Sequence, residues 1–144
     1  MPYPSDDALA LADELRPVLQ RLYRRIRRED ADLGASPIQR LLLLVISENP
    51  GFGVGELAKH EKLRGPTISG HVKSMEAAGL IKRLAVDPID RRRSSIFLTD
   101  KGRELLEEYR RRRRDWIAGQ LERLTPQGRE AIRAALAPLS EIGQ

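Results

Sequence analysis

The sequence of 144 residues contains no cysteine. This absence excludes disulfide bonds and any redox sensor that works through a thiol, and it fits a reducing compartment. No apolar run approaches the roughly 18 residues that a membrane-spanning helix needs. The first apolar stretch begins after Asp6 and Asp7, whereas a signal peptide begins with positive charge. We therefore expect a cytoplasmic protein that does not enter a membrane.

Common catalytic motifs are also missing. The chain has no Ser-His-Asp order, no glycine-rich loop that would hold a phosphate and no His-Glu zinc motif. We therefore expect neither an enzyme nor a bound cofactor. What the sequence does contain is charge: Lys and Arg number 26 against 21 Asp and Glu, which gives a net charge of +5. The arginines occur in clusters, and such clusters favour an anionic partner.

A short amphipathic helix is predicted to begin at Gly65 and Pro66, because proline is well tolerated at the first helical position. Its apolar stripe repeats at steps of three and four residues and consists of Ile68, Val72 and Met75. The opposite face is small and polar, with Gly70 at its centre. A mid-helix glycine costs about 1 kcal/mol relative to alanine, so close approach to another surface is a candidate explanation. An ordinary amphipathic helix explains the pattern equally well.

A β-hairpin is predicted directly after this helix. Gly79 occupies a typical helix-ending position. Two alternating segments, 80–86 and 95–99, flank a turn of sequence Asp87-Pro88-Ile89-Asp90. Three arginines, Arg91, Arg92 and Arg93, follow at the tip. A solvated hairpin is one interpretation, but narrow minor grooves attract guanidinium groups, and the position after a small-faced helix favours DNA.

These segments resemble the MarR family of winged helix-turn-helix regulators. The resemblance is carried by Gly79-Leu80-Ile81-Lys82-Arg83, Asp87-Pro88-Ile89-Asp90-Arg91-Arg92 and Leu98-Thr99-Asp100-Lys101-Gly102. It implies a mainly α fold with a small β-wing, an intertwined homodimer formed by long N- and C-terminal helices, and binding of double-stranded DNA at a palindromic operator. It also implies that Asp90 steadies Arg92 in the minor groove. Many members carry arginine where this chain has Gly70, so the expected base contacts shift to neighbouring residues of the helix.

The residues expected to contact DNA lie on this helix and on the wing. They are Arg64, Pro66, Thr67, Ser69, Gly70, His71, Lys73, Ser74, Asp90, Arg91, Arg92 and Arg93. The resemblance further implies a repressor that a small aromatic or anionic ligand releases. The candidate ligand residues are Tyr23, Arg27, Tyr109 and Trp116, although each is also interpretable as a packing or surface residue. A constitutive or architectural DNA-binding protein without an effector is the alternative.

The rest of the chain predicts helices on either side of this lobe. Ser5 is a candidate N-cap, and the stripe that follows is close to a heptad seam that Pro17 should kink or divide. Ser36-Pro37-Ile38-Gln39 is a capping box before an apolar helix. We expect one domain over 1–144, with dimerisation helices in 5–31 and 99–144 and a DNA-binding lobe in 36–98. Five arginines at 110–114 are interpreted as a solvated helix face.

The two histidines, His60 and His71, fall on separate short helices. Together with Glu56 they could in principle hold a metal ion. A surface histidine and a DNA-facing histidine are the simpler interpretation, and we therefore expect no metal site.

Overall fold

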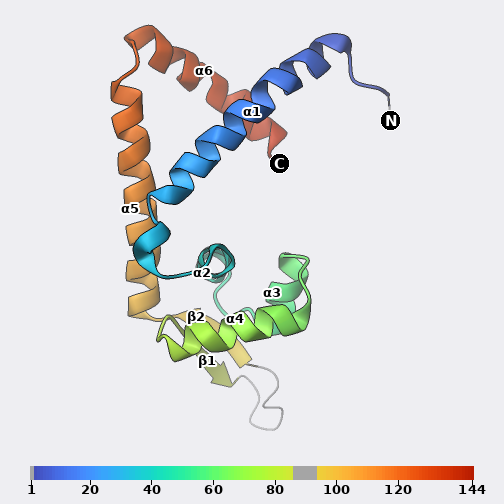
Figure 1. The fold of residues 1–144 in the computed structure, drawn as a ribbon. Coiled ribbons are helices and arrows are strands. Elements are labelled where there is room, and N and C mark those ends of the chain that lie inside the picture. The colour runs from blue at the N-terminus through green and yellow to red at the C-terminus, as the bar shows by residue number, and fades with distance from the viewer. Residues whose placement is uncertain (1, 86–93) are drawn as a thin grey trace. The chain divides into compact units, whose positions relative to one another are not determined.

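The computed structural model describes residues 2–85 and 94–144. It is mainly helical with one antiparallel pair of strands, which confirms the expected fold class (Figure 1). The elements in chain order are α1 (Asp6–Arg28), the 3-10 turn η1 (Ala31–Leu33), α2 (Pro37–Glu48), α3 (Val54–His60), α4 (Gly65–Ala77), β1 (Ile81–Ala85), β2 (Ser94–Leu98), α5 (Asp100–Glu122) and α6 (Pro126–Ile142). None of these helices is long and apolar enough to cross a membrane.

The chain divides into two compact units. One, which we call the lobe, comprises residues 31–110. The other, which we call the helical unit, comprises residues 1–30 and 111–144. Helix α5 contributes its first half to the lobe, because Leu106 and Tyr109 are buried in the lobe's apolar core.

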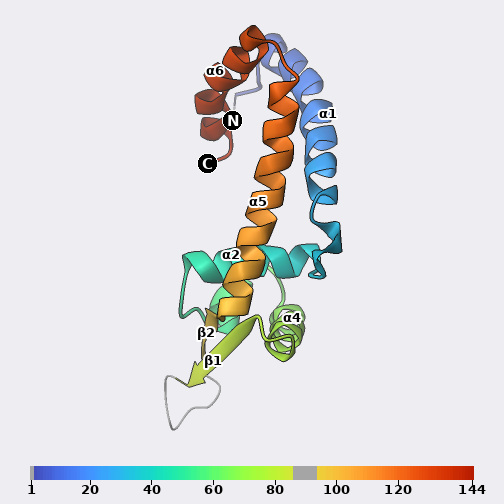
Figure 2. The same ribbon diagram turned by 90° about the vertical axis from the view of Figure 1, so that its left-hand side faces the viewer.

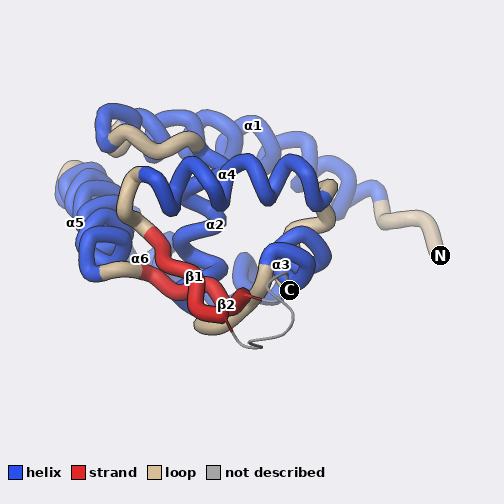
Figure 3. The backbone as a smooth tube through the Cα atoms, turned by 90° about the horizontal axis from the view of Figure 1, so that it is seen from below, coloured by secondary structure: helices blue, strands red, loops and turns tan. Residues whose placement is uncertain are grey.

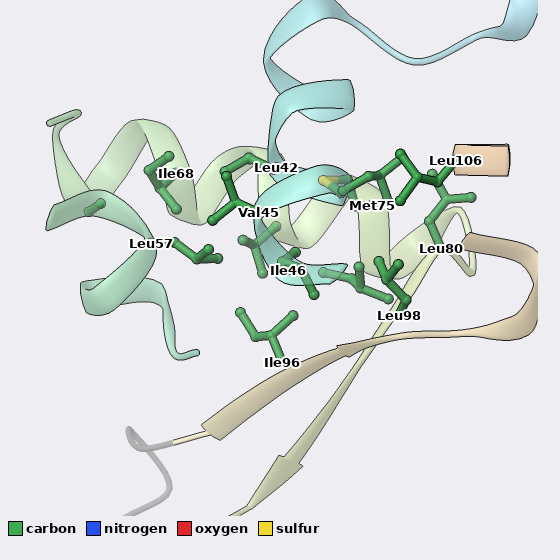
Figure 4. Packing of buried hydrophobic residues seen from close by; sticks show 14 of the residues in the cluster. Leu42, Val45, Ile46, Leu57, Ile68, Met75, Leu80, Ile96, Leu98 and Leu106 are labelled. Atoms are coloured by element: carbon green, nitrogen blue, oxygen red, sulfur yellow. The ribbon is translucent and has the colours of Figure 1, made fainter. Parts of the chain in front are cut away.

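The core of the lobe is built around α2 (Figure 4). Four residues of this helix are buried: Leu42, Leu43, Val45 and Ile46. The helix begins as predicted, with the Ser36 hydroxyl accepting a hydrogen bond from the Gln39 amide and the Gln39 side chain accepting one from the Ser36 amide, each at 3.2 Å. Each bond satisfies an amide that would otherwise lack a partner at the helix start. The buried stripe of α4 packs into the same core.

Helices α3 and α4 form the expected helix-turn-helix. Between them Lys62 adopts a φ of 53°, and the Leu63 amide donates to the Ala58 carbonyl at 3.0 Å, which closes the turn tightly. Strands β1 and β2 follow as an antiparallel pair (Figures 2 and 3). In this pair Ile81 is opposite Leu98 and Arg83 is opposite Ile96. Ile96 and Leu98 are buried, so one face of the hairpin completes the core of the lobe.

In the helical unit α1 begins with the expected cap at Ser5, and α6 begins with a second cap of the same kind. The Ser5 hydroxyl accepts from the Ala8 amide at 3.2 Å, and the Thr125 hydroxyl accepts from the Gly128 amide at 3.1 Å. Helix α1 continues through Pro17 and is not divided there. No residue of α1 or α6 is buried within the described part of the chain.

The helical unit does contain one buried charge, at the end of its first segment. Asp30 is 1% exposed, and the Arg113 guanidinium donates to both of its carboxylate oxygens. Arg113 belongs to the run of five arginines that was interpreted as a solvated face. That interpretation is incomplete for this residue, because its partner is 83 positions away and local periodicity does not reveal it.

Candidate nucleic-acid interface

Helix α4 presents the predicted polar face outward and the predicted apolar stripe inward. Ile68, Val72 and Met75 are buried in the core of the lobe. The exposed residues at its start and on its opposite face are Arg64, Pro66, Thr67, Gly70, Lys73 and Ser74. Ser69 and His71 are half-buried and flank this face. The lobe therefore exposes a helix face that is polar and that has short side chains except at Arg64 and Lys73.

Gly70 lies in open space at the centre of this face. Apart from its chain neighbours and the nearby backbone of α4, a Cβ atom built there would meet no atom of the described chain within 4 Å. Packing inside the chain therefore does not require glycine at this position, although glycine weakens the helix relative to alanine. This favours the interpretation in which Gly70 allows close approach of the helix backbone to an outside surface.

Two cations that the sequence analysis did not single out lie beside the start of α4. Lys59 is in the last turn of α3, and Lys62 is in the turn that follows, and both are exposed. Together with Arg64 they give the helix-turn-helix a run of positive charge that suits phosphate groups. Both lysines are visible in the sequence, at the end of α3 and in the turn before α4. Apolar periodicity identifies the faces of helices, however, and carries no information about turn residues.

The wing is only partly described. Asp90, Arg91, Arg92 and Arg93 lie outside the described residues, and their expected contacts with DNA stay predictions. Strand β1 is linked to α4 by an ion pair in which Arg83 Nε lies 3.4 Å from a carboxylate oxygen of Glu76. This pair links the direction of the hairpin to α4.

The four candidate ligand residues fall in both units. In the helical unit the Arg27 guanidinium lies 5.7 Å from the ring centre of Tyr23, and Arg25 lies 5.8 Å from that of Trp116. In the lobe Tyr109 is 4% exposed, with Arg40 5.5 Å from its ring centre. The expected role of all four in ligand binding stays a prediction.

A separate hollow of about 500 Å³ lies within the lobe. Its walls come from the segment before α2, the end of α4 and the start of α5, and include Leu33, Met75, Leu80, Lys101 and Leu105. None of the four candidate ligand residues lines it.

The histidines lie as single side chains. His60 Nδ1 is 3.0 Å from a carboxylate oxygen of Glu61, and its ring meets Phe52 edge-on. His71 is half-buried on α4. Over residues 2–85 and 94–144, no three His, Cys, Asp or Glu side chains cluster in a way that could hold a metal ion.

Comparison with known proteins agrees with this architecture. A model of the MarR family matches residues 33–93, which span η1 to the wing. The HTH-type transcriptional regulator YybA of Bacillus subtilis (strain 168) is 31% identical over 108 residues, which are 75% of this chain and 71% of that protein. A MarR family protein from Bacillus stearothermophilus has a TM-score of 0.79 and 26% identity, with 99% of this chain and 100% of that chain covered.

The fold is also that of a solved DNA complex. A mutant of S. aureus MepR bound to an oligodeoxyribonucleotide matches with a TM-score of 0.72 and 23% identity, covering 93% of this chain and 98% of that chain. The helix-turn-helix, the wing strands and these relatives agree on one assignment. The chain belongs to the MarR family, and it is a DNA-binding transcriptional regulator and not an enzyme.

Proposed function

We propose that the protein is a homodimeric, cytoplasmic repressor that binds an inverted repeat in double-stranded DNA. The observation that carries the proposal is the exposed face of α4. This face is small and polar, and Gly70 at its centre has open space around it. The apolar stripe on the opposite side of α4 is buried in the core of the lobe. A helix held in this way can enter a major groove, where its side chains meet the edges of the bases.

The proposed roles follow from the positions on α4. Thr67, Ser69, His71 and Ser74 contact base edges or nearby phosphates, and Pro66 and Gly70 allow the backbone to approach. Arg64 and Lys73 bind phosphates. On the wing Arg91, Arg92 and Arg93 reach the flanking minor groove, with Asp90 steadying Arg92; the support here is the family resemblance and the direction of β1 and β2.

The support for a homodimer is the exposed apolar surface of α1 and α6. Large apolar side chains on both helices are more than a third exposed in the single chain: Leu11, Val18, Leu19, Leu22, Leu136, Leu139 and Ile142. So many exposed large apolar side chains on two helices favour association with another protein surface. A two-fold dimer places two recognition helices roughly 34–36 Å apart, about one turn of DNA, so the operator is an inverted repeat.

The proposal includes release from DNA by a small aromatic anion. Its support is the family resemblance, together with cations and aromatic rings that lie in contact, as in the pairs Arg27–Tyr23 and Arg25–Trp116. A panel of aromatic acids added to the protein–DNA complex tests this part. Dissociation by at least one acid is expected for an effector-controlled repressor, and a complex that resists all of them supports the constitutive alternative.

The experiment for DNA recognition uses an operator obtained by selection from random duplexes. Fluorescence anisotropy then compares Lys73→Gln and Arg92→Ala with Arg123→Gln, which removes the same charge from the turn that follows α5. We expect both test variants to bind the operator at least tenfold more weakly, and Arg123→Gln to bind like the wild type. For Lys73→Gln the slope of log K against log salt should fall by about 0.9, the amount expected for one lost phosphate contact. Unchanged affinity in both test variants would overturn these roles.

A further inference from the structure

The end of helix α4 and the beginning of helix α5 lie in direct contact within the lobe. The last turn of a helix leaves carbonyl groups without intrahelical partners, and these need donors from elsewhere. At the end of α4, two donors come from the chain just beyond it: the Gly79 amide bonds the Glu76 carbonyl and the Leu80 amide bonds the Met75 carbonyl, each at 3.0 Å. Gly79 has a φ of 77°, which this helix ending requires.

The carbonyl groups of Ala78, Gly79 and Leu80 receive donors from Thr99 and Lys101, at the start of α5. The Lys101 ammonium donates to the Ala78 carbonyl at 2.8 Å, and the Thr99 hydroxyl donates to the Gly79 carbonyl at 2.5 Å. The Thr99 amide donates to the Leu80 carbonyl at 3.1 Å. A cation at a helix C-terminus is also favoured by the helix dipole. The side chains of Thr99 and Lys101 are therefore hydrogen-bonded to the backbone directly after α4.

The Thr99 hydroxyl has a second bond. It accepts from the Gly102 amide at 3.1 Å and so caps α5 while it donates to the end of α4. Gly102 keeps the two ends close, because a Cβ atom there would lie 2.1 Å from the Leu80 carbonyl oxygen. The sequence Thr99-Asp100-Lys101-Gly102 thus supplies a hydroxyl, an ammonium and a position without a side chain at one junction. We call this junction the helix clamp.

We propose that Thr99 and Lys101 are positioning residues for DNA recognition, because the helix clamp fixes the end of α4 from which Lys73 and Ser74 project. The inference rests on the proposed function of α4. Neither residue lies on the exposed face of that helix. Thr99 and Lys101 contribute by fixing the position of α4 in the major groove. Contacts with bases depend on this position far more than contacts with phosphates do.

This role predicts a pattern that a phosphate contact does not. A lysine that binds a phosphate strengthens all DNA binding, and its removal lowers the salt slope by about 0.9. A lysine that bonds the Ala78 carbonyl affects the register of base contacts, so its removal weakens operator binding without altering binding to other sequences. Lys101→Met is the direct test, because it keeps the apolar stem and removes the ammonium.

Thr99→Val requires a control for the lost helix cap. The chain provides one in Thr125, whose hydroxyl accepts from the Gly128 amide at the same 3.1 Å but starts α6 in the other unit. Thr125→Val removes a cap of the same chemistry without touching the helix clamp. Thr99→Ser keeps the hydroxyl and both of its hydrogen bonds, so this variant should bind the operator as the wild type does.

The experiment measures affinity for the selected operator and for a scrambled duplex at several salt concentrations, together with thermal unfolding. We expect Thr99→Val and Lys101→Met to lose at least tenfold in operator affinity. Scrambled-duplex affinity should change less than twofold, and the salt slope should stay at the wild-type value. Thr125→Val and Thr99→Ser should stay within twofold of the wild type on both duplexes.

Three results would overturn the inference or its basis, and they can be told apart. A wild-type protein that does not distinguish operator from scrambled DNA contradicts the proposed function itself. A wild-type protein with a clear preference, but with Lys101→Met and Thr99→Val equal to Thr125→Val, contradicts the helix clamp alone. Equal loss on both duplexes for Lys101→Met, with a reduced salt slope, assigns this lysine to a phosphate. If Thr99→Val does not fold, Lys101→Met alone decides.

Discussion

The lobe and the helical unit differ in how many of their large apolar side chains are buried. The lobe buries most of its large apolar side chains in one cluster, and Leu42, Leu43, Leu57 and Ile96 are fully excluded from solvent. In the helical unit α1 and α6 bury no residue, and Leu22 on α1 remains 45% exposed. The lobe covers most of its large apolar side chains within a single chain, whereas the helical unit leaves many of them in contact with water. This difference supports the proposed division into a part that reads DNA and a part that associates with a second copy of the chain.

The largest expected effect comes from a cavity in the lobe. Leu42→Ala should lower the free energy of unfolding by about 2–5 kcal/mol, because Leu42 is fully buried and its methyl groups leave a void. Chemical denaturation measures this loss, which should not depend on protein concentration. A loss below about 1 kcal/mol would contradict the assignment of α2 as the centre of the core.

A somewhat smaller loss is expected in the helical unit from its buried charge. Arg113→Met removes a guanidinium bonded to the buried Asp30 carboxylate and should cost about 2–4 kcal/mol. Arg114→Met is the matched control, because Arg114 is exposed and pairs with Asp115 on the surface, where a pair contributes about 0–1 kcal/mol. Equal stability of the two variants in thermal or chemical unfolding would show that the Asp30 pair has no special role.

The exposed stripe of α1 provides the third test. Leu22→Glu should weaken dimerisation by about 2 kcal/mol, or roughly thirtyfold, because a leucine that is buried on association is replaced by a charge. Sedimentation at several concentrations measures the dissociation constant, and Glu14→Gln on the same helix is a control for a polar position. A monomeric wild-type protein, or a Leu22→Glu variant that associates normally, would contradict the proposed dimer surface.

The smallest expected effect concerns Gly70. Gly70→Ala should stabilise the lobe by about 0.5–1 kcal/mol, since alanine favours the helix and the added Cβ meets no atom of the described chain. It should nevertheless weaken operator binding, because the methyl group stands between the helix and DNA. Gly119→Ala on α5 has equally open surroundings and should stabilise its helix without affecting operator affinity. If operator affinity is the same for both variants, Gly70 has no role in close approach.

Much of the fold could be predicted from the sequence because its signals are local. The capping box at Ser36, the cap at Ser5 and the buried stripe of α4 each depend on residues a few positions apart. The order of helices and strands then gave the winged helix-turn-helix, and the polar face of α4 was found where its periodicity placed it.

What could not be predicted depends on contacts between distant residues. The Lys101–Ala78 bond spans 23 positions and the Arg113–Asp30 pair spans 83. Arg113 looked like its four neighbours in the arginine run, since nothing in a local pattern reveals which one meets a buried carboxylate. Similarly, the motif Leu98-Thr99-Asp100-Lys101-Gly102 was identified as a family resemblance, but its possible role became visible only when its donors were placed against the end of α4.

The most direct test of the account is selection of random duplexes on the purified protein at about physiological salt. We predict enrichment of one inverted repeat whose half-sites lie about one helical turn apart, because two copies of α4 in a two-fold dimer must read equivalent sequences. Enrichment of a single, non-repeated half-site would contradict the dimer, and DNA retained without a consensus would contradict sequence reading by α4.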